Sequence, residues 1–80
     1  MLIKGDIIYC IRPMGGLTLN KGYKVEMIRW DIKGKSSDIC IYDDDRLAHW
    51  FGQQGEFESW TNWFINEIQY NREQKINQII

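Results

Sequence analysis

Apolar and polar residues alternate with a period of two in three short segments of the chain, which is the pattern of a half-buried β-strand. These segments cover about residues 7–12, 23–30 and 39–42, and Gly, Pro or Asp bounds each of them. A fourth short segment covers residues 47–51. Strands of this length separated by turns predict a small, mainly β fold, an SH3-like barrel of four to five antiparallel strands.

The same alternation predicts which side chains share a face, because successive residues of a strand point to opposite sides of the sheet. In the first segment, Ile8 and Cys10 fall on one face. The second segment places Tyr23, Val25 and Met27 on one face, opposite Lys24, Glu26 and Ile28.

Turns are predicted where Gly, Pro, Asn, Asp and Ser cluster between the strands. The segment 33–37 is expected to connect the second and third strands as a hairpin. The other predicted turns are residues 13–16, 20–22, 43–45 and 52–55.

The pattern changes from Ser59 onward, where large apolar residues recur at the spacing of a helix. Ser59 is a suitable N-cap for such a helix. The apolar stripe consists of Trp60, Trp63, Phe64 and Ile68. A short fifth strand within residues 63–68 is the competing interpretation. For the tail, residues 66–80, three outcomes stay open: it continues the helix, frays, or orders on a partner.

Length and composition favour one folded domain that spans residues 1–80, with the barrel at about 4–58 and an aromatic C-terminal extension at 59–80. The chain has 80 residues, of which 44% are hydrophobic and 14% aromatic. A segment of about 20 apolar residues, as a membrane span requires, does not occur in the sequence. We therefore expect a cytoplasmic protein (in the host cell if it is viral) that makes no contact with a membrane.

Cysteines and acidic residues give no clear sign of catalysis. Cys10 and Cys40 lie within predicted strands, and we expect both to be free and buried. The residues 43–45 are all Asp, and His49 follows four positions later. Adjacent residues of a strand point apart, so we expect a solvated turn there, with a small metal-dependent enzyme as the weakest alternative. We predict no catalytic residue, no metal and no cofactor.

The excess of aromatic rings is more informative. Four Trp, four Tyr and three Phe are more than an 80-residue barrel can bury completely. Trp and Tyr dominate binding hot spots between proteins. We expect Trp50 to be in the core, and we expect a protein partner or a second copy of the chain to contact Trp60, Trp63, Phe64, Trp30 and Tyr42.

Basic residues gather around the second predicted strand and its hairpin. With Trp30 nearby, they offer a second function, contact with RNA or DNA, in which cations bind phosphates and a ring stacks on a base. These residues are Lys21, Lys24, Arg29, Lys33 and Lys35. The net charge of −1 lacks the basic character of most nucleic-acid-binding domains, and an ordinary solvated hairpin explains the same residues.

Three motifs resemble a group of small proteins encoded by tailed phages. The first motif is Lys4, Gly5, Asp6, Ile8, Cys10 and Ile11; the second is Lys21, Gly22, Tyr23 and Val25; the third is Ile39, Ile41 and the three Asp residues 43–45. The resemblance covers about residues 4–58. It implies an SH3-like barrel and a small phage accessory protein.

Together these features predict a protein that acts by binding. We expect a phage-encoded accessory protein that binds a host or anti-phage defence protein and modulates or inhibits it. A homodimer is a further expectation, and binding to nucleic acid is the alternative function.

Overall fold

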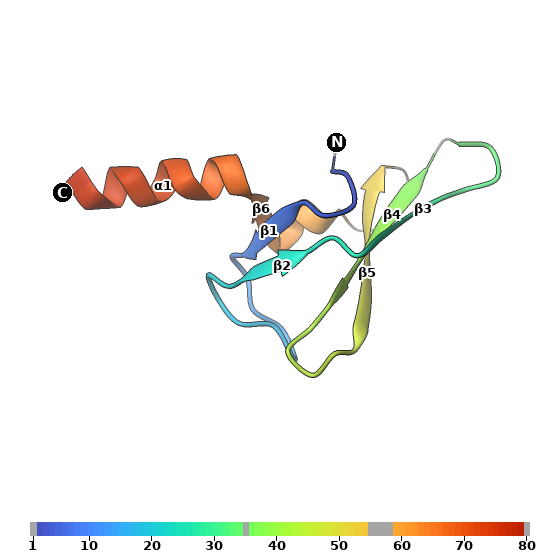
Figure 1. Ribbon diagram of the computed structural model, residues 1–80, viewed down its shortest axis with the longest axis horizontal. Coiled ribbons are helices and arrows are strands. Elements are labelled where there is room, and N and C mark those ends of the chain that lie inside the picture. Colours follow the sequence, from blue (N-terminus) through green and yellow to red (C-terminus); the bar gives the residue numbers. More distant parts are fainter. Residues whose placement is uncertain (1, 35, 55–58, 80) are drawn as a thin grey trace.

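The computed structural model describes residues 2–34, 36–54 and 59–79. It shows six strands in two small antiparallel sheets, a short 3-10 helix and one C-terminal α-helix (Figure 1). The elements in chain order are β1 (Ile7–Cys10), β2 (Gly22–Lys24), β3 (Met27–Trp30), β4 (Ser37–Tyr42), β5 (Ala48–Gln54), η1 (Trp60–Asn62), β6 (Phe64–Asn66) and α1 (Glu67–Ile79).

The strand order confirms the predicted mainly β fold. One sheet has the order β2-β1-β6 and the other has the order β3-β4-β5. The chain passes from the first sheet to the second between β2 and β3, and it returns between β5 and β6 through η1. Two such sheets closing on one core form a small SH3-like barrel.

The passage between the sheets occurs at two consecutive residues. The amide of Val25 donates to the carbonyl of Asp6 beside β1, at 2.8 Å, while the amide of Glu26 donates to the carbonyl of Cys40 in β4, also at 2.8 Å. This change of partner shifts the alternation of side chains by one residue. Val25 is fully buried, but Met27 is exposed. The prediction that these two side chains share a face is therefore wrong.

The core lies between the two sheets and consists mostly of aliphatic and aromatic side chains. The ring of Phe64 packs edge-on against Phe51, with 5.3 Å between the ring centroids. Ile8 and Cys10 share the buried face of β1, as the alternation predicts. Both cysteines are free and buried, also as expected.

The strand β5 continues into a segment where a turn is predicted. Gly52 and Gln53 belong to β5, and Gly52 also forms a parallel bridge with Ser59. Gly52 has no side chain and is buried, so a second backbone segment can approach it closely. The turn prediction is wrong up to Gln54, and its last residue, Gly55, lies outside the described residues.

The segment after Ser59 is not one continuous helix. Ser59 caps the short helix η1, and the chain then extends as β6, which pairs with β1. The competing interpretation, a strand within residues 63–68, is therefore confirmed. Because β6 completes a sheet, the barrel does not end at residue 58.

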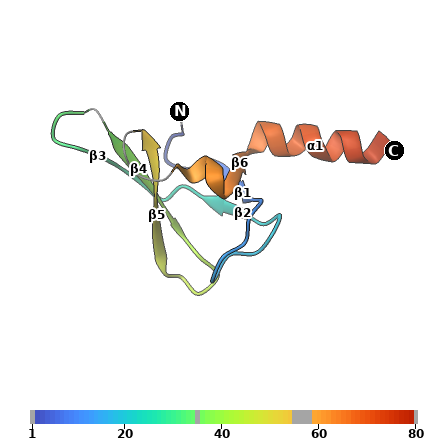
Figure 2. The ribbon, with the colours of Figure 1, turned by 180° about the vertical axis from the view of Figure 1, so that it is seen from behind.

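The helix α1 begins directly after β6 and projects away from the barrel (Figures 1 and 2). Its aromatic contact with the barrel joins Tyr70 to Tyr9, whose rings are stacked with centroids 3.9 Å apart and planes 5° apart. Among the described residues, no helix has the length and apolar character needed to cross a membrane.

Candidate functional site

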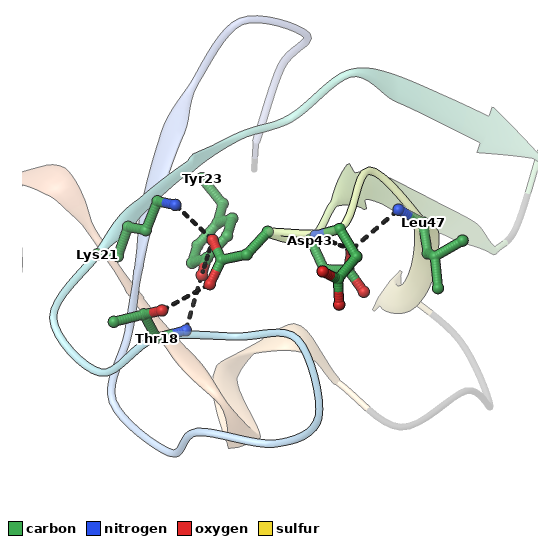
Figure 3. A network of polar contacts seen from close by, with 7 residues as sticks. Thr18, Lys21, Tyr23, Asp43 and Leu47 are labelled. Carbon is green, nitrogen blue, oxygen red and sulfur yellow. Dashed lines mark hydrogen bonds and ion pairs between the residues drawn. The ribbon is translucent and has the colours of Figure 1, made fainter.

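The acidic turn between β4 and β5 is held by hydrogen bonds to Asp43. Its carboxylate accepts from the amide of Leu47 at 2.9 Å (Figure 3). It also accepts from the amide of Asp45 at 2.8 Å and contacts His49 Nε2 at 2.8 Å. These contacts lower the pKa of the Asp43 carboxyl, and the hydrogen bond from Leu47 contributes most. Asp43 is 7% exposed, so the expectation of a solvated residue is wrong here.

The neighbouring carboxylate, Asp44, binds a different segment. It accepts from Thr18 Oγ1 at 2.5 Å and from the hydroxyl of Tyr23 at 3.1 Å, and it forms an ion pair with Lys21 (Figure 3). The bond from Lys21, followed by that from Thr18, lowers the pKa of Asp44. The same contact with Asp44 raises the pKa of Lys21.

These two sets of contacts give the acidic turn a structural role. Asp43 bonds within its own turn, whereas Asp44 joins that turn to the loop between β1 and β2. The carboxylates do not share a hydrogen-bonding partner in the part of the chain that the structure describes, and no group of three or more His, Cys, Asp or Glu residues there could hold a metal ion.

A different surface gathers exposed apolar side chains on the outer side of the sheet β3-β4-β5. Met27, Cys40 and Trp50 are register partners across the three strands, so their side chains lie in one row on one face. Tyr42 and Ala48 form the next row. We call the exposed side chains of these rows, together with Arg29, the sheet face: Met27, Arg29, Tyr42, Ala48 and Trp50.

The sheet face is apolar at its centre. Met27 and Tyr42 are each 45% exposed and Trp50 is 40% exposed, whereas Cys40 between them is fully buried. Burial is the main reason why the pKa of the Cys40 thiol is raised. Cys40 is not part of the central core cluster, and its register partners Met27 and Trp50 flank it on the sheet face.

A cation lies across this apolar surface. The guanidinium carbon of Arg29 is 4.3 Å from the centre of the Trp50 ring. Its Nη2 and Nε donate to one oxygen of Asp38, at 2.7 and 3.3 Å. Asp38 is nearly buried and belongs to the next row of the same face. The guanidinium of Arg29 therefore contacts both a carboxylate and a ring, although 61% of the Arg29 side chain is exposed.

Two more exposed apolar side chains, Trp30 at the end of β3 and Ile32 two residues further on, stand at the start of the loop after β3. This loop lies at the end of the molecule opposite α1 (Figures 1 and 2). Trp30 is 44% exposed, and Ile32 is fully exposed. Both line a cavity of about 590 Å³, together with Arg29 and Lys33.

The structure separates the five aromatic residues that the sequence predicts as partner contacts. Trp30 and Tyr42 are exposed on β3 and β4. Trp63 is half-buried with its ring 5.3 Å from that of Phe51, and Trp60 is half-buried at the edge of the core. Phe64 is fully buried, so it offers no surface for contact.

For two residues of the sheet face, the structure differs from what the sequence predicts. Trp50 is predicted in the core but is exposed. Met27 is exposed too, and it is not among the predicted partner contacts. The feature of the sequence that indicates this surface is the small residue Cys40 in the neighbouring strand β4. It leaves room for the larger side chains of Met27 and Trp50 on either side.

The predicted basic cluster is divided. Lys21 and Arg29 are ion-paired with Asp44 and Asp38. Lys24 is exposed on β2 and Lys33 is exposed in the β3–β4 loop. Lys35 lies outside the described residues.

Comparisons of the chain with family models, curated proteins and solved structures found no significant match.

Proposed function

We propose that this protein acts by binding another protein through its sheet face. The observation that carries this proposal is the row in which exposed Met27 and Trp50 flank the buried Cys40. Three large side chains, those of Met27, Tyr42 and Trp50, are presented together by hydrogen-bonded strands. A rigid apolar group of this kind is typical of the centre of a protein interface.

The charges around the sheet face favour a protein partner over nucleic acid. Arg29 is paired with Asp38, and Lys21 is paired with Asp44, so neither cation is available to a phosphate without the loss of an existing ion pair. Arg is also enriched in protein interfaces, where its stem and planar head cover aromatic rings.

The resemblance of residues 4–58 to small tailed-phage proteins supports a specific partner class. We propose a phage accessory protein whose partner is a host or anti-phage defence protein, which it modulates or inhibits. A homodimer formed through the same face is the competing assembly.

The decisive experiment captures partners from a bacterial lysate, identifies them, and measures the binding of each purified partner by calorimetry. We expect Trp50→Ala and Met27→Ala to weaken binding by about tenfold or more, as hot-spot residues do. Leu19→Ala is the matched control, because Leu19 is an exposed apolar residue outside the sheet face.

Three outcomes would contradict the proposal. The first is a partner that binds all three variants equally. The second is capture of RNA or DNA with an affinity that falls steeply with salt. The third is a dimer in light scattering that is lost in Trp50→Ala, which would assign the face to self-association.

A further inference from the structure

A second cavity, none of whose described lining residues belongs to the sheet face, lies where the helix α1 begins. It has a volume of about 520 Å³. Its apolar lining comes from Leu2, Ile7, Trp60 and Ile68. We call it the helix-start cleft.

The helix-start cleft carries acidic groups and lacks a basic one. Asp6 and Glu67 both line it, and none of its lining residues in the part of the chain that the structure describes is Lys or Arg. One oxygen of Asp6 accepts from the amide of Ile3, at 2.9 Å. The amide oxygens of the remaining polar lining residues, Gln53 and Asn66, accept from backbone amides at 2.7 Å. The carboxylates are thus the main acceptors left for a ligand.

The protein already contains one arginine that contacts both an indole ring and a carboxylate. On the sheet face, Arg29 lies 4.3 Å from the centre of the Trp50 ring and bonds the carboxylate of Asp38. The helix-start cleft offers an indole, that of Trp60, and two carboxylates, but no Lys or Arg lines it among the described residues.

We propose that the helix-start cleft binds an arginine side chain of a partner protein. The methylene stem lies along the apolar lining, the guanidinium faces the Trp60 ring, and Asp6 and Glu67 accept its hydrogen bonds. A flat cation with several donors satisfies a ring and two carboxylates at once, which an apolar side chain cannot do. This inference does not depend on the sheet face.

The test uses the full chain labelled with ¹⁵N and the probe N-acetyl-arginine methylamide. We expect saturable shifts of the Trp60 indole N–H and of the amides of Ile7 and Ile68, with half-saturation below about 10 mM. N-acetyl-citrulline methylamide has the same shape without the charge, and we expect it to give no saturable shift. The Trp60 signal is assigned from its absence in Trp60→Phe.

Charge neutralisation identifies the acceptors. We expect Asp6→Asn and Glu67→Gln each to weaken binding about two- to fivefold, the usual range for a partly exposed ion pair. Glu73→Gln is the control, because Glu73 is an exposed carboxylate on the same helix. Trp50→Ala is expected to bind the probe normally, which separates this inference from the proposed function.

The proposal is wrong if citrulline binds as well as arginine, or if both neutralising variants bind like the control. It is also wrong if the probe gives no saturable shift at concentrations up to about 50 mM. A lysine analogue that binds more tightly than arginine would replace arginine as the occupant.

Discussion

Arg29 and Trp50 form a cation–π pair on the outer face of the sheet, with the guanidinium carbon 4.3 Å from the ring centre. They come from the two outer strands of the sheet, β3 and β5, and Asp38 of the central strand bonds the same guanidinium. The pair therefore links all three strands on a surface that is otherwise apolar.

Removal of the cation from this pair should destabilise the protein. We expect Arg29→Ala to lower the free energy of unfolding by about 1–3 kcal/mol, because it leaves the nearly buried carboxylate of Asp38 without its partner. Urea denaturation measures the change. In the double variant Arg29→Ala/Asp38→Asn the loss should be smaller than the sum of the single losses, and additive losses would show that the two residues are not coupled.

Cys40 should report whether the sheet face is covered. Its thiol is fully buried between Met27 and Trp50, and burial raises its pKa, so we expect slow alkylation by iodoacetamide in the native protein. Trp50→Ala should accelerate alkylation of Cys40 by about tenfold, since it opens one side of the cover. Cys10 is the internal control, because it lies in the central core and should stay protected. Equal acceleration of both cysteines would indicate general unfolding.

Substitution of Gly16 by alanine should destabilise the protein more than the same substitution at a glycine with a similar φ. Its φ is +82°, and an added Cβ would lie 2.5 Å from a carboxylate oxygen of Asp43. Gly5 has a φ of +97° with nothing within 4 Å of the added atom. We expect Gly5→Ala to cost about 1–2 kcal/mol, and Gly16→Ala to cost at least about 1 kcal/mol more, because it adds a clash to the same backbone strain. Equal urea midpoints for the two variants would show that the turn at Asp43 makes room for the added Cβ atom without loss of stability.

The acidic turn should make the protein sensitive to low pH. The pKa values of Asp43 and Asp44 are both lowered from 3.8 in the folded protein. A lowered pKa contributes stability that is fully present above the ordinary value and is lost as the pH falls through the folded value. The melting temperature should therefore fall steeply below about pH 4, and Asp44→Asn should lower it at neutral pH and flatten that fall. An unchanged acid transition in Asp44→Asn would remove Asp44 as a cause.

The sequence predicts the position of the first strand and which of its side chains share a face. The alternation in residues 7–12 places Ile8 and Cys10 together, and both are fully buried. The opposite face carries Ile7, Tyr9 and Ile11 and is also apolar in the sequence, so alternation alone does not show which face is buried. The prediction from alternation fails where the chain changes sheets at Val25. A shift of one residue there moves every later side chain of the strand to the other face, and the amino-acid composition does not reveal it.

The position of Trp50 shows a second limit. His49 and Phe51 lie on the inner face of β5, and the larger apolar residue between them lies on the outer face. Hydrophobicity alone places the indole inside and the imidazole outside. The true arrangement depends on the hydrogen bond from His49 to the buried Asp43, a contact between two residues of one hairpin that alternation does not encode.

The helix α1 should depend on a single aromatic contact. It has 13 residues, which is marginal for a helix in water, and most of its described side chains are exposed. The stacking of Tyr70 on Tyr9 joins its second turn to β1. We expect Tyr70→Ala to reduce the helical circular dichroism signal and to speed amide exchange in α1, while the barrel keeps its melting temperature. Asn71→Ala is the control, because Asn71 is exposed and the substitution raises helix propensity. Should Tyr70→Ala leave the exchange of α1 unchanged, the helix would be stable without the barrel, and the stack would be a consequence of the helix rather than its support.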